Sequence, residues 1–324
     1  MIAAKAIFMN RQTFLGYIYA AAGSALFSTK AIFIKIAYID QVNPPLMLAL
    51  RNLMALPFFV VVGIYAWRRM LKQGTHLPSG KLIGQALLTG FIGYYISSLL
   101  DFEGLVYISA QLERLVLFTY PIFVIFLGAM FFNTRLTMMS LICASITYLG
   151  LLVVFMSALP EGGRNTWIGT ALVLGCALTF ALYQLLAKKF ISLMGSTLFT
   201  SVALSGSAVA CIAHYVLVSR SFDFSSSPRF FEMAAGCALF ATVLPSFMVN
   251  AGLSRISAQS TAMISSISPI ITISLAVWIL GEHFTLADAI GSAMVIAGIT
   301  IYAMTDKKPE REIKQLLAGE IEPA

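Results

Sequence analysis

Charged residues inside the apolar runs of this sequence are the first candidates for chemistry, and they are unevenly distributed. The first half contains Lys30, Arg51, Asp101, Glu103, Glu113 and Arg114. At similar depth the second half has His214. Because a charge at the centre of a bilayer costs about 2.5–3.5 kcal/mol on insertion scales, each of these groups needs a partner or a function. We therefore expect any cavity among these runs to be electrostatically asymmetric.

Glu113 is the first choice for a functional charge, and it has two interpretations. As an intramembrane carboxylate it would bind a proton or the cationic group of a solute. Alternatively it forms a structural ion pair with Lys30, Arg51 or Arg114, which neutralises both partners and fixes the packing of two helices.

Arg51 lies about two turns into the second apolar run, where its planar guanidinium suits a carboxylate ligand. It could instead pair with Glu113 or extend to the membrane interface. Lys30 is a similar but weaker candidate for ligand binding, because it could reach the surface beside Lys35.

Pro121 and Pro269 lie in the middle of two apolar runs, 148 residues apart. Each removes a backbone hydrogen bond and clashes with the preceding turn of a helix. Irregular backbone at membrane depth is tolerated where it faces protein or a watery cavity, so breaks at matching positions indicate a binding site. The alternative is an ordinary packing kink.

Aromatic and imidazole side chains complete the set of candidates. Tyrosines that could line a cavity for an aromatic or amphipathic solute are Tyr94, Tyr95, Tyr107, Tyr120 and Tyr183. His214 could titrate near neutral pH, although a single His within a helix commonly makes only a hydrogen bond.

The elements that must position these residues are membrane-spanning helices. The chain has 324 residues, of which 59% are hydrophobic and 11% are charged, whereas a soluble protein has about 25% charged residues. Runs long enough to cross about 30 Å of hydrocarbon recur along the chain. They lie near 13–35, 45–66, 82–100, 105–131, 138–157, 166–187, 198–218, 232–251, 258–280 and 286–304.

The distribution of positive charge predicts the orientation in the membrane. Of the 21 Lys and Arg residues, fourteen fall in one set of alternate loops and the two termini. The positive-inside rule therefore places both termini in the cytoplasm, and we expect a multi-pass protein of the inner (cytoplasmic) membrane. The net charge of +7 is spread over short loops, which argues against a nucleic-acid partner.

An internal repeat divides the chain. The segment Gly104–Gln111 recurs as Gly252–Gln259 with six of eight positions identical, and the same offset of 148 pairs Pro121 with Pro269. Each copy holds five expected spans, and because five is odd the second copy must cross the membrane upside down. We expect a first repeat over 1–157, an inverted second repeat over 158–305 and a cytoplasmic tail over 306–324.

The repeated Gly-Leu-x-x-Ile-Ser-Ala-Gln pattern, the following Pro-containing run and Leu280–Thr285 resemble the EamA-type repeat of the drug/metabolite transporter superfamily. The resemblance covers about 14–304. It implies a ten-helix fold with a central cavity, and substrates among amino acids, other metabolites or amphipathic drugs. One departure concerns the family's Gly-Glu-Arg loop. It reads Gly281–His283 in the second repeat but Asn133–Arg135 in the first, which puts a helix-capping Glu in doubt there.

The function expected on these grounds is secondary transport, because inverted repeats are a recurrent plan of secondary transporters. The substrate would be an amino acid or a similar amphipathic solute, and the direction would be export. A proton antiporter that uses Glu113 and a facilitative carrier both fit. No nucleotide-binding loop or enzymatic motif occurs, and the four cysteines lack metal-ligand spacing, so we expect no enzyme activity, metal or other cofactor. The alternatives are a membrane receptor or scaffold and an intramembrane enzyme.

Overall fold

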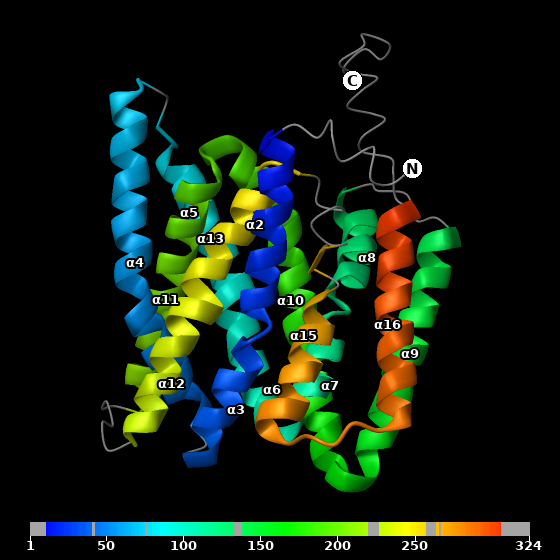
Figure 1. Ribbon diagram of the computed structural model, residues 1–324. Coiled ribbons are helices and arrows are strands. Elements are labelled where there is room, and N and C mark those ends of the chain that lie inside the picture. Colours follow the sequence, from blue (N-terminus) through cyan, green and yellow to red (C-terminus); the bar gives the residue numbers. More distant parts are fainter. Residues whose placement is uncertain are drawn as a thin grey trace.

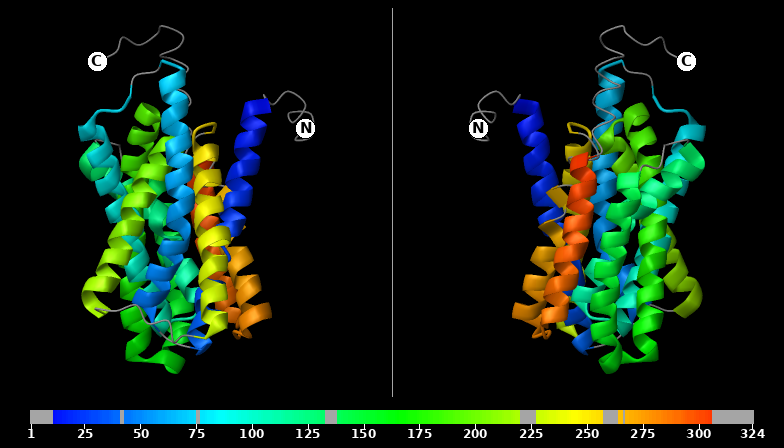
Figure 2. Two further views of the ribbon diagram at one scale, coloured as in Figure 1. Left: turned by 90° about the vertical axis from the view of Figure 1, so that its left-hand side faces the viewer. Right: turned by 90° about the vertical axis from the view of Figure 1, so that its right-hand side faces the viewer.

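The computed structural model describes residues 11–40, 43–74, 77–132, 138–219, 227–256, 264–265 and 267–305 of the chain. Every regular element in these ranges is a helix, and the helices form one elongated bundle along a common axis (Figures 1 and 2). Apolar side chains pack on all sides of most helices, as expected where lipid and protein, rather than water, surround them.

The helices of the first half are α2 (Arg11–Phe27), α3 (Lys30–Asp40), α4 (Pro44–Lys72), α5 (Gly80–Gly90), η2 (Phe91–Ile96), α6 (Ser97–Tyr107), α7 (Ala110–Leu117), α8 (Tyr120–Phe132) and α9 (Met138–Gly162). Those of the second half are α10 (Arg164–Met194), α11 (Ser196–Ser219), α12 (Pro228–Ala238), η3 (Leu239–Val243), α13 (Leu244–Leu253), α15 (Ile267–Leu275), η4 (Ala276–Leu280) and α16 (Leu286–Thr305).

Seven helical segments of the described residues are long and apolar enough to cross a membrane, which makes the chain a multi-pass membrane protein. They coincide with the expected spans one to four and six to eight. Shorter apolar helices occupy the other three expected spans, at Leu141–Ser157, Ser268–Leu280 and Leu286–Gly298. The start of the ninth expected span and the tail over 306–324 lie outside the described residues, so the count of ten remains a prediction.

The two ends of the described chain lie at the same end of the bundle. The first residues of α2 and the last residues of α16 are both at the top of Figure 1. This arrangement requires an even number of passes, in agreement with the predicted orientation of the termini.

The helices pack through close contacts at glycine. Extensive contacts join α4 with α11, α9 with α16, α2 with α13 and α6 with α10. At Gly104, which lies on α6, an added Cβ would be 2.6 Å from Val173 Cγ2. At Gly252, its repeat equivalent, an added Cβ would be 3.1 Å from Ala20 Cβ. Small residues therefore let these helix backbones approach closely.

Irregular helix geometry occurs at matching positions of the two halves. The π-helical segment η2 begins at Phe91 and η3 begins at Leu239, which again differ by 148. Short π-helical insertions inside α-helices are frequent at functional sites, because they re-aim the side chains around them. Here both segments face the centre of the bundle, where the cavity described below is found.

The α9–α16 contact provides a test of this packing. An added Cβ at Gly291 would lie 2.5 Å from both Gly150 O and Val154 Cγ2. We expect Gly291→Val to destabilise the protein by about 1–3 kcal/mol, the usual cost of overpacking. Gly84→Ala is the matched control, because nothing lies within 4 Å of its added Cβ. The measurement is the unfolding midpoint in detergent, and equal midpoints for the two variants would contradict the described packing.

Candidate functional site

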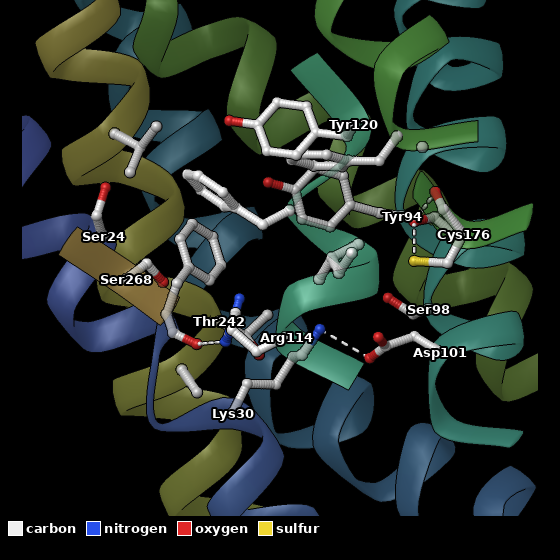
Figure 3. Close-up of a pocket in the computed structure, with 18 of the residues that line it drawn as sticks. Ser24, Lys30, Tyr94, Ser98, Asp101, Arg114, Tyr120, Cys176, Thr242 and Ser268 are labelled. Atoms are coloured by element: carbon white, nitrogen blue, oxygen red, sulfur yellow. Dashed lines mark hydrogen bonds and ion pairs between the residues drawn. The ribbon is translucent and has the colours of Figure 1, made fainter. Parts of the chain in front are cut away.

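A cavity lies at the centre of the bundle, between the irregular helices of both halves (Figure 3). It has about 880 Å³ of empty space when the open solvent at its mouth is included. Its wall combines charged side chains, hydroxyl groups and aromatic rings. Tyr94 and Tyr120 lie on one side in Figure 3, whereas Lys30, Asp101 and Arg114 lie on the other.

Lys30 forms the central ion pair of the charged side. Its Nζ lies 2.7 Å from Asp101 Oδ2 and 3.7 Å from Glu113 Oε1. Asp101 is 1% exposed and Glu113 is fully buried. Lys30 begins α3 directly after a two-residue break, so the helix break places its ammonium group at the depth of the two carboxylates.

Arg114 is fixed by a hydrogen bond to a backbone carbonyl that the same helix break leaves free. Because α2 ends at Phe27, the carbonyl group of Phe27 is in the last turn of that helix and needs a donor from elsewhere. Arg114 Nη2 donates to it at 2.7 Å, and Arg114 Nε donates to Thr272 Oγ1 at 3.0 Å. These bonds connect α7 with both α2 and α15.

Arg51 is buried on α4 and has fewer partners. Its Nη2 donates to Ser98 Oγ at 3.3 Å, and its guanidinium carbon lies 4.8 Å from the centre of the Phe102 ring. Its Nε has no hydrogen-bond partner among the described residues. Within the described part of the chain, neither Arg51 nor Arg114 forms an ion pair with a carboxylate.

The aromatic side of the cavity is a set of packed rings. Tyr94 lies edge-on to Tyr183 with ring centres 5.0 Å apart, and Tyr120 lies edge-on to Phe180 at 5.1 Å. Phe180 is 6.4 Å from Tyr94 and therefore connects the two tyrosines. This set of rings can make favourable contacts with a further ring or an apolar chain.

The fourth expected span is broken between α7 and α8. The N–H of Thr119 donates to the carbonyl of Val116, which ends α7, and Pro121 follows in the first turn of α8. Pro is tolerated in a first turn because its missing N–H would have no helical partner there. Pro269 is likewise near the start of α15, within the described residues. Pro121 therefore accompanies a helix start rather than a kink in a continuous helix, whereas the residues before Ile267 lie partly outside the described part of the chain.

The N-terminus of α7 is capped by the other half of the chain. Ser109 accepts from the N–H of Leu112, and the Glu282 carboxylate accepts from the N–H groups of Ala110 at 2.8 Å and Gln111 at 3.2 Å. The Gln111 side chain also donates to the carbonyl of His283. A carboxylate at this position suits the positive end of the helix. The first-half counterpart, Asn133–Arg135, lies outside the described residues.

Several predicted site residues meet at the cavity. Lys30, Arg51 and Tyr120 line it. Glu113 lies against it through Lys30, and this contact is the ion pair that one interpretation predicted. Arg51 and Arg114 are not its ion-pair partners among the described residues.

The cavity wall does not include the predicted residues Tyr183, His214, Pro121 and Pro269. Tyr183 is buried behind Tyr94 and stacks on Phe180 and Phe199. His214 shares a hydrogen bond of 2.8 Å with the hydroxyl group of Tyr95, so it has the simple hydrogen-bonding role that was the alternative.

The site also includes Asp101, Arg114, Phe180 and Glu282. Asp101 and Arg114 carried a signal, because both are charges within apolar runs, but nothing indicated that Asp101 rather than Glu113 would be the nearer partner of Lys30. Phe180 carried no signal, since one phenylalanine among many in a membrane helix is inconspicuous. Glu282 belongs to the Gly281–His283 loop that the resemblance to the EamA-type repeat singled out.

The fold is a multi-pass helical bundle around a central cavity, and comparison with known proteins assigns its family. The model of the EamA-like transporter family matches residues 14–156 and again 167–304. The chain belongs to this family.

Individual relatives are consistent with this assignment. A Bacillus subtilis (strain 168) protein, uncharacterized transporter YcbK, is 28% identical over 90% of this chain and 93% of its own length. Uncharacterized transporter YetK of the same organism is 23% identical over 74% of each chain. A crystal structure with 16% sequence identity superposes with a TM-score of 0.60, covering 91% of this chain and 98% of that one, which shows a shared fold.

The Lys30–Asp101 pair gives a test of the charged side. Removing one member of a buried ion pair costs about 3–5 kcal/mol, because it leaves the other charge uncompensated. We expect Lys30→Met to lower the unfolding midpoint strongly, and Lys30→Met/Asp101→Asn to recover more than half of the loss. The midpoints are measured in one detergent. If the double variant is as unstable as the sum of its single variants, the two groups do not neutralise each other.

Proposed function

We propose that the chain is a secondary transporter of the cytoplasmic membrane that exports a small amphipathic metabolite, such as an amino acid, through the central cavity. The observation that carries this proposal is the two-sided wall of the cavity, with charged groups on one side and packed rings on the other. Such a wall suits a solute that has a charged end and an apolar body.

Alternating access in this proposal is a movement of two inverted five-helix halves, over 1–157 and 158–305. The packing supports it, because with an offset of 148 α4 corresponds to α11 and α9 to α16, and each pair packs together. The α2–α13 contact corresponds in the same way to the α6–α10 contact. A two-fold axis between the halves generates this pattern, since it maps every contact onto its equivalent.

The contact between Glu282 and the start of α7 is a suitable closing point on the non-cytoplasmic side of the predicted topology. Two backbone N–H groups of α7 donate to Glu282, and the side-chain amide of Gln111 donates to the neighbouring carbonyl of His283. Such hydrogen bonds can be exchanged for bonds to water when the halves separate, so opening does not require a buried charge to lose all its partners.

Two modes of coupling remain in this proposal. The first is facilitated transport driven by the gradient of the solute or by the membrane potential. The second is proton coupling at Glu113, which the surroundings of its carboxylate support. Glu113 is fully buried beside a second carboxylate, Asp101, and its contact with Lys30 is long, at 3.7 Å.

Exchange in proteoliposomes tests the function. We expect vesicles that contain the full chain, preloaded with a panel of amino acids, purines, carboxylates and amines, to exchange at least one of these classes faster than empty vesicles. Glu113→Gln separates the coupling modes, with Glu103→Gln on α6 as the control carboxylate outside the cavity wall. Proton coupling predicts that Glu113→Gln abolishes transport driven by a pH gradient but retains exchange. Unchanged behaviour would make Glu113 a structural charge, and a failure to exchange any solute would contradict transport.

A further inference from the structure

We infer that the substrate is an organic monocarboxylate. Its carboxylate would bind Arg51 and Arg114, and its apolar or aromatic body would pack against the rings of Tyr94, Tyr120 and Phe180. This inference rests on the proposed transport function and specifies its substrate class.

The charge balance of the cavity favours an anionic solute. The wall contains three cations, Lys30, Arg51 and Arg114, and the carboxylate of Asp101, with Glu113 directly behind it. Asp101 is engaged by Lys30 at 2.7 Å. A net positive charge therefore remains even when both carboxylates are ionised. The undescribed segment 257–263 contains no acidic residue that could compensate it.

The two guanidinium groups have N–H donors that the described residues do not use. Each guanidinium has five N–H donors. In the described residues Arg51 makes one side-chain hydrogen bond and its Nε makes none, while Arg114 makes two. Both side chains are buried, at 3% and 6% exposure. Buried charge without a partner is costly, and a carboxylate matches the planar geometry of the remaining donors.

Among the described residues of the cavity wall, the one carboxylate that an ammonium group could reach is already paired with Lys30. An amine would need Asp101, which is already paired with Lys30, or Glu113, which is fully buried. It would also be repelled by the two guanidinium groups. The amino group of an amino acid therefore gains no partner here, and a cationic solute is rejected.

The rings form the part of the wall that would contact the apolar body of the solute. Tyr94 and Tyr120 lie on the side of the cavity opposite Lys30, Asp101 and Arg114 (Figure 3), and Phe180 joins them. A solute that binds the guanidinium groups with a carboxylate therefore directs its other end towards these rings. An aromatic or branched apolar body fills this space with favourable ring contacts.

An anionic substrate also accounts for export without a coupled proton. The membrane potential of a bacterial cell is negative inside, so it drives a monovalent anion outward. At equilibrium 100 mV corresponds to a concentration ratio of about 50-fold in favour of the outside. Transport of the anion alone is then electrogenic.

Three solutes with the same phenylethyl body test the charge requirement: 3-phenylpropionate, phenylalanine and phenethylamine. The full chain is reconstituted in liposomes, and each solute competes with exchange of labelled 3-phenylpropionate. We expect phenylalanine to compete at least 10-fold more weakly than 3-phenylpropionate, and phenethylamine not to compete. An inside-negative potassium diffusion potential should accelerate efflux of 3-phenylpropionate.

Variants connect this selectivity with the residues. Arg51→Gln and Arg114→Gln should each reduce exchange of 3-phenylpropionate at least 10-fold. Arg229→Gln is the control, because Arg229 is half-exposed and pairs with Asp40 away from the cavity. Arg51→Lys keeps the charge and serves if Arg51→Gln does not fold. Phe180→Leu should shift the preference from 3-phenylpropionate towards hexanoate, since it removes a ring but leaves the charges.

The outcomes separate this inference from the proposed function. Preferred exchange of phenylalanine, phenethylamine or another amine would overturn the anion inference and leave transport intact. Preferred exchange of a different carboxylate would support it. If no solute of a panel of anions, amino acids and amines exchanges, the proposed function itself is wrong.

Discussion

A charge that is surrounded by apolar helices has to find a partner or remain costly, and the centre of this transporter is organised by that constraint. Lys30 satisfies it with Asp101 and, at longer range, with Glu113. Arg114 satisfies it with a backbone carbonyl and a hydroxyl group. Arg51 satisfies it least, with one long hydrogen bond and the face of a ring. The cavity forms where these partly satisfied groups meet.

Helix breaks supply the partners that the charges need. The end of α2 at Phe27 exposes a carbonyl group to Arg114, and the start of α3 places Lys30 beside Asp101. The start of α7 exposes N–H groups, which donate hydrogen bonds to Glu282 of the other half. A continuous helix would satisfy its own backbone groups and offer none of these bonds. The same interruptions that hold the charges therefore also connect the two halves, which is where a transporter has to move.

Much of the fold was predictable from the sequence, because lipid imposes a minimum length on every apolar helix and the repeat fixes the correspondence between halves. The position of Pro121 indicated the helix break between α7 and α8, whereas the residues before Pro269 lie partly outside the described part of the chain. The sequence could not predict which charges pair, because that depends on the rotation of each helix about its own axis. Lys30 therefore turned out to lie nearer Asp101 than Glu113, and His214 lies beside Tyr95 rather than in the cavity. The π-helical segments η2 and η3 have no sequence signal beyond their shared offset.

The proposed alternating access requires that one cavity be exposed in turn to the two sides of the membrane. Its most direct test is the reaction of a cysteine at Gln184, which lines the cavity, in a chain whose four native cysteines are replaced. A membrane-impermeant thiol reagent is applied to right-side-out and to inverted vesicles, with Ser192→Cys as a one-sided control. We expect Gln184→Cys to react from both sides and Ser192→Cys to react from one. Reaction of Gln184→Cys from a single side under all conditions would contradict alternating access.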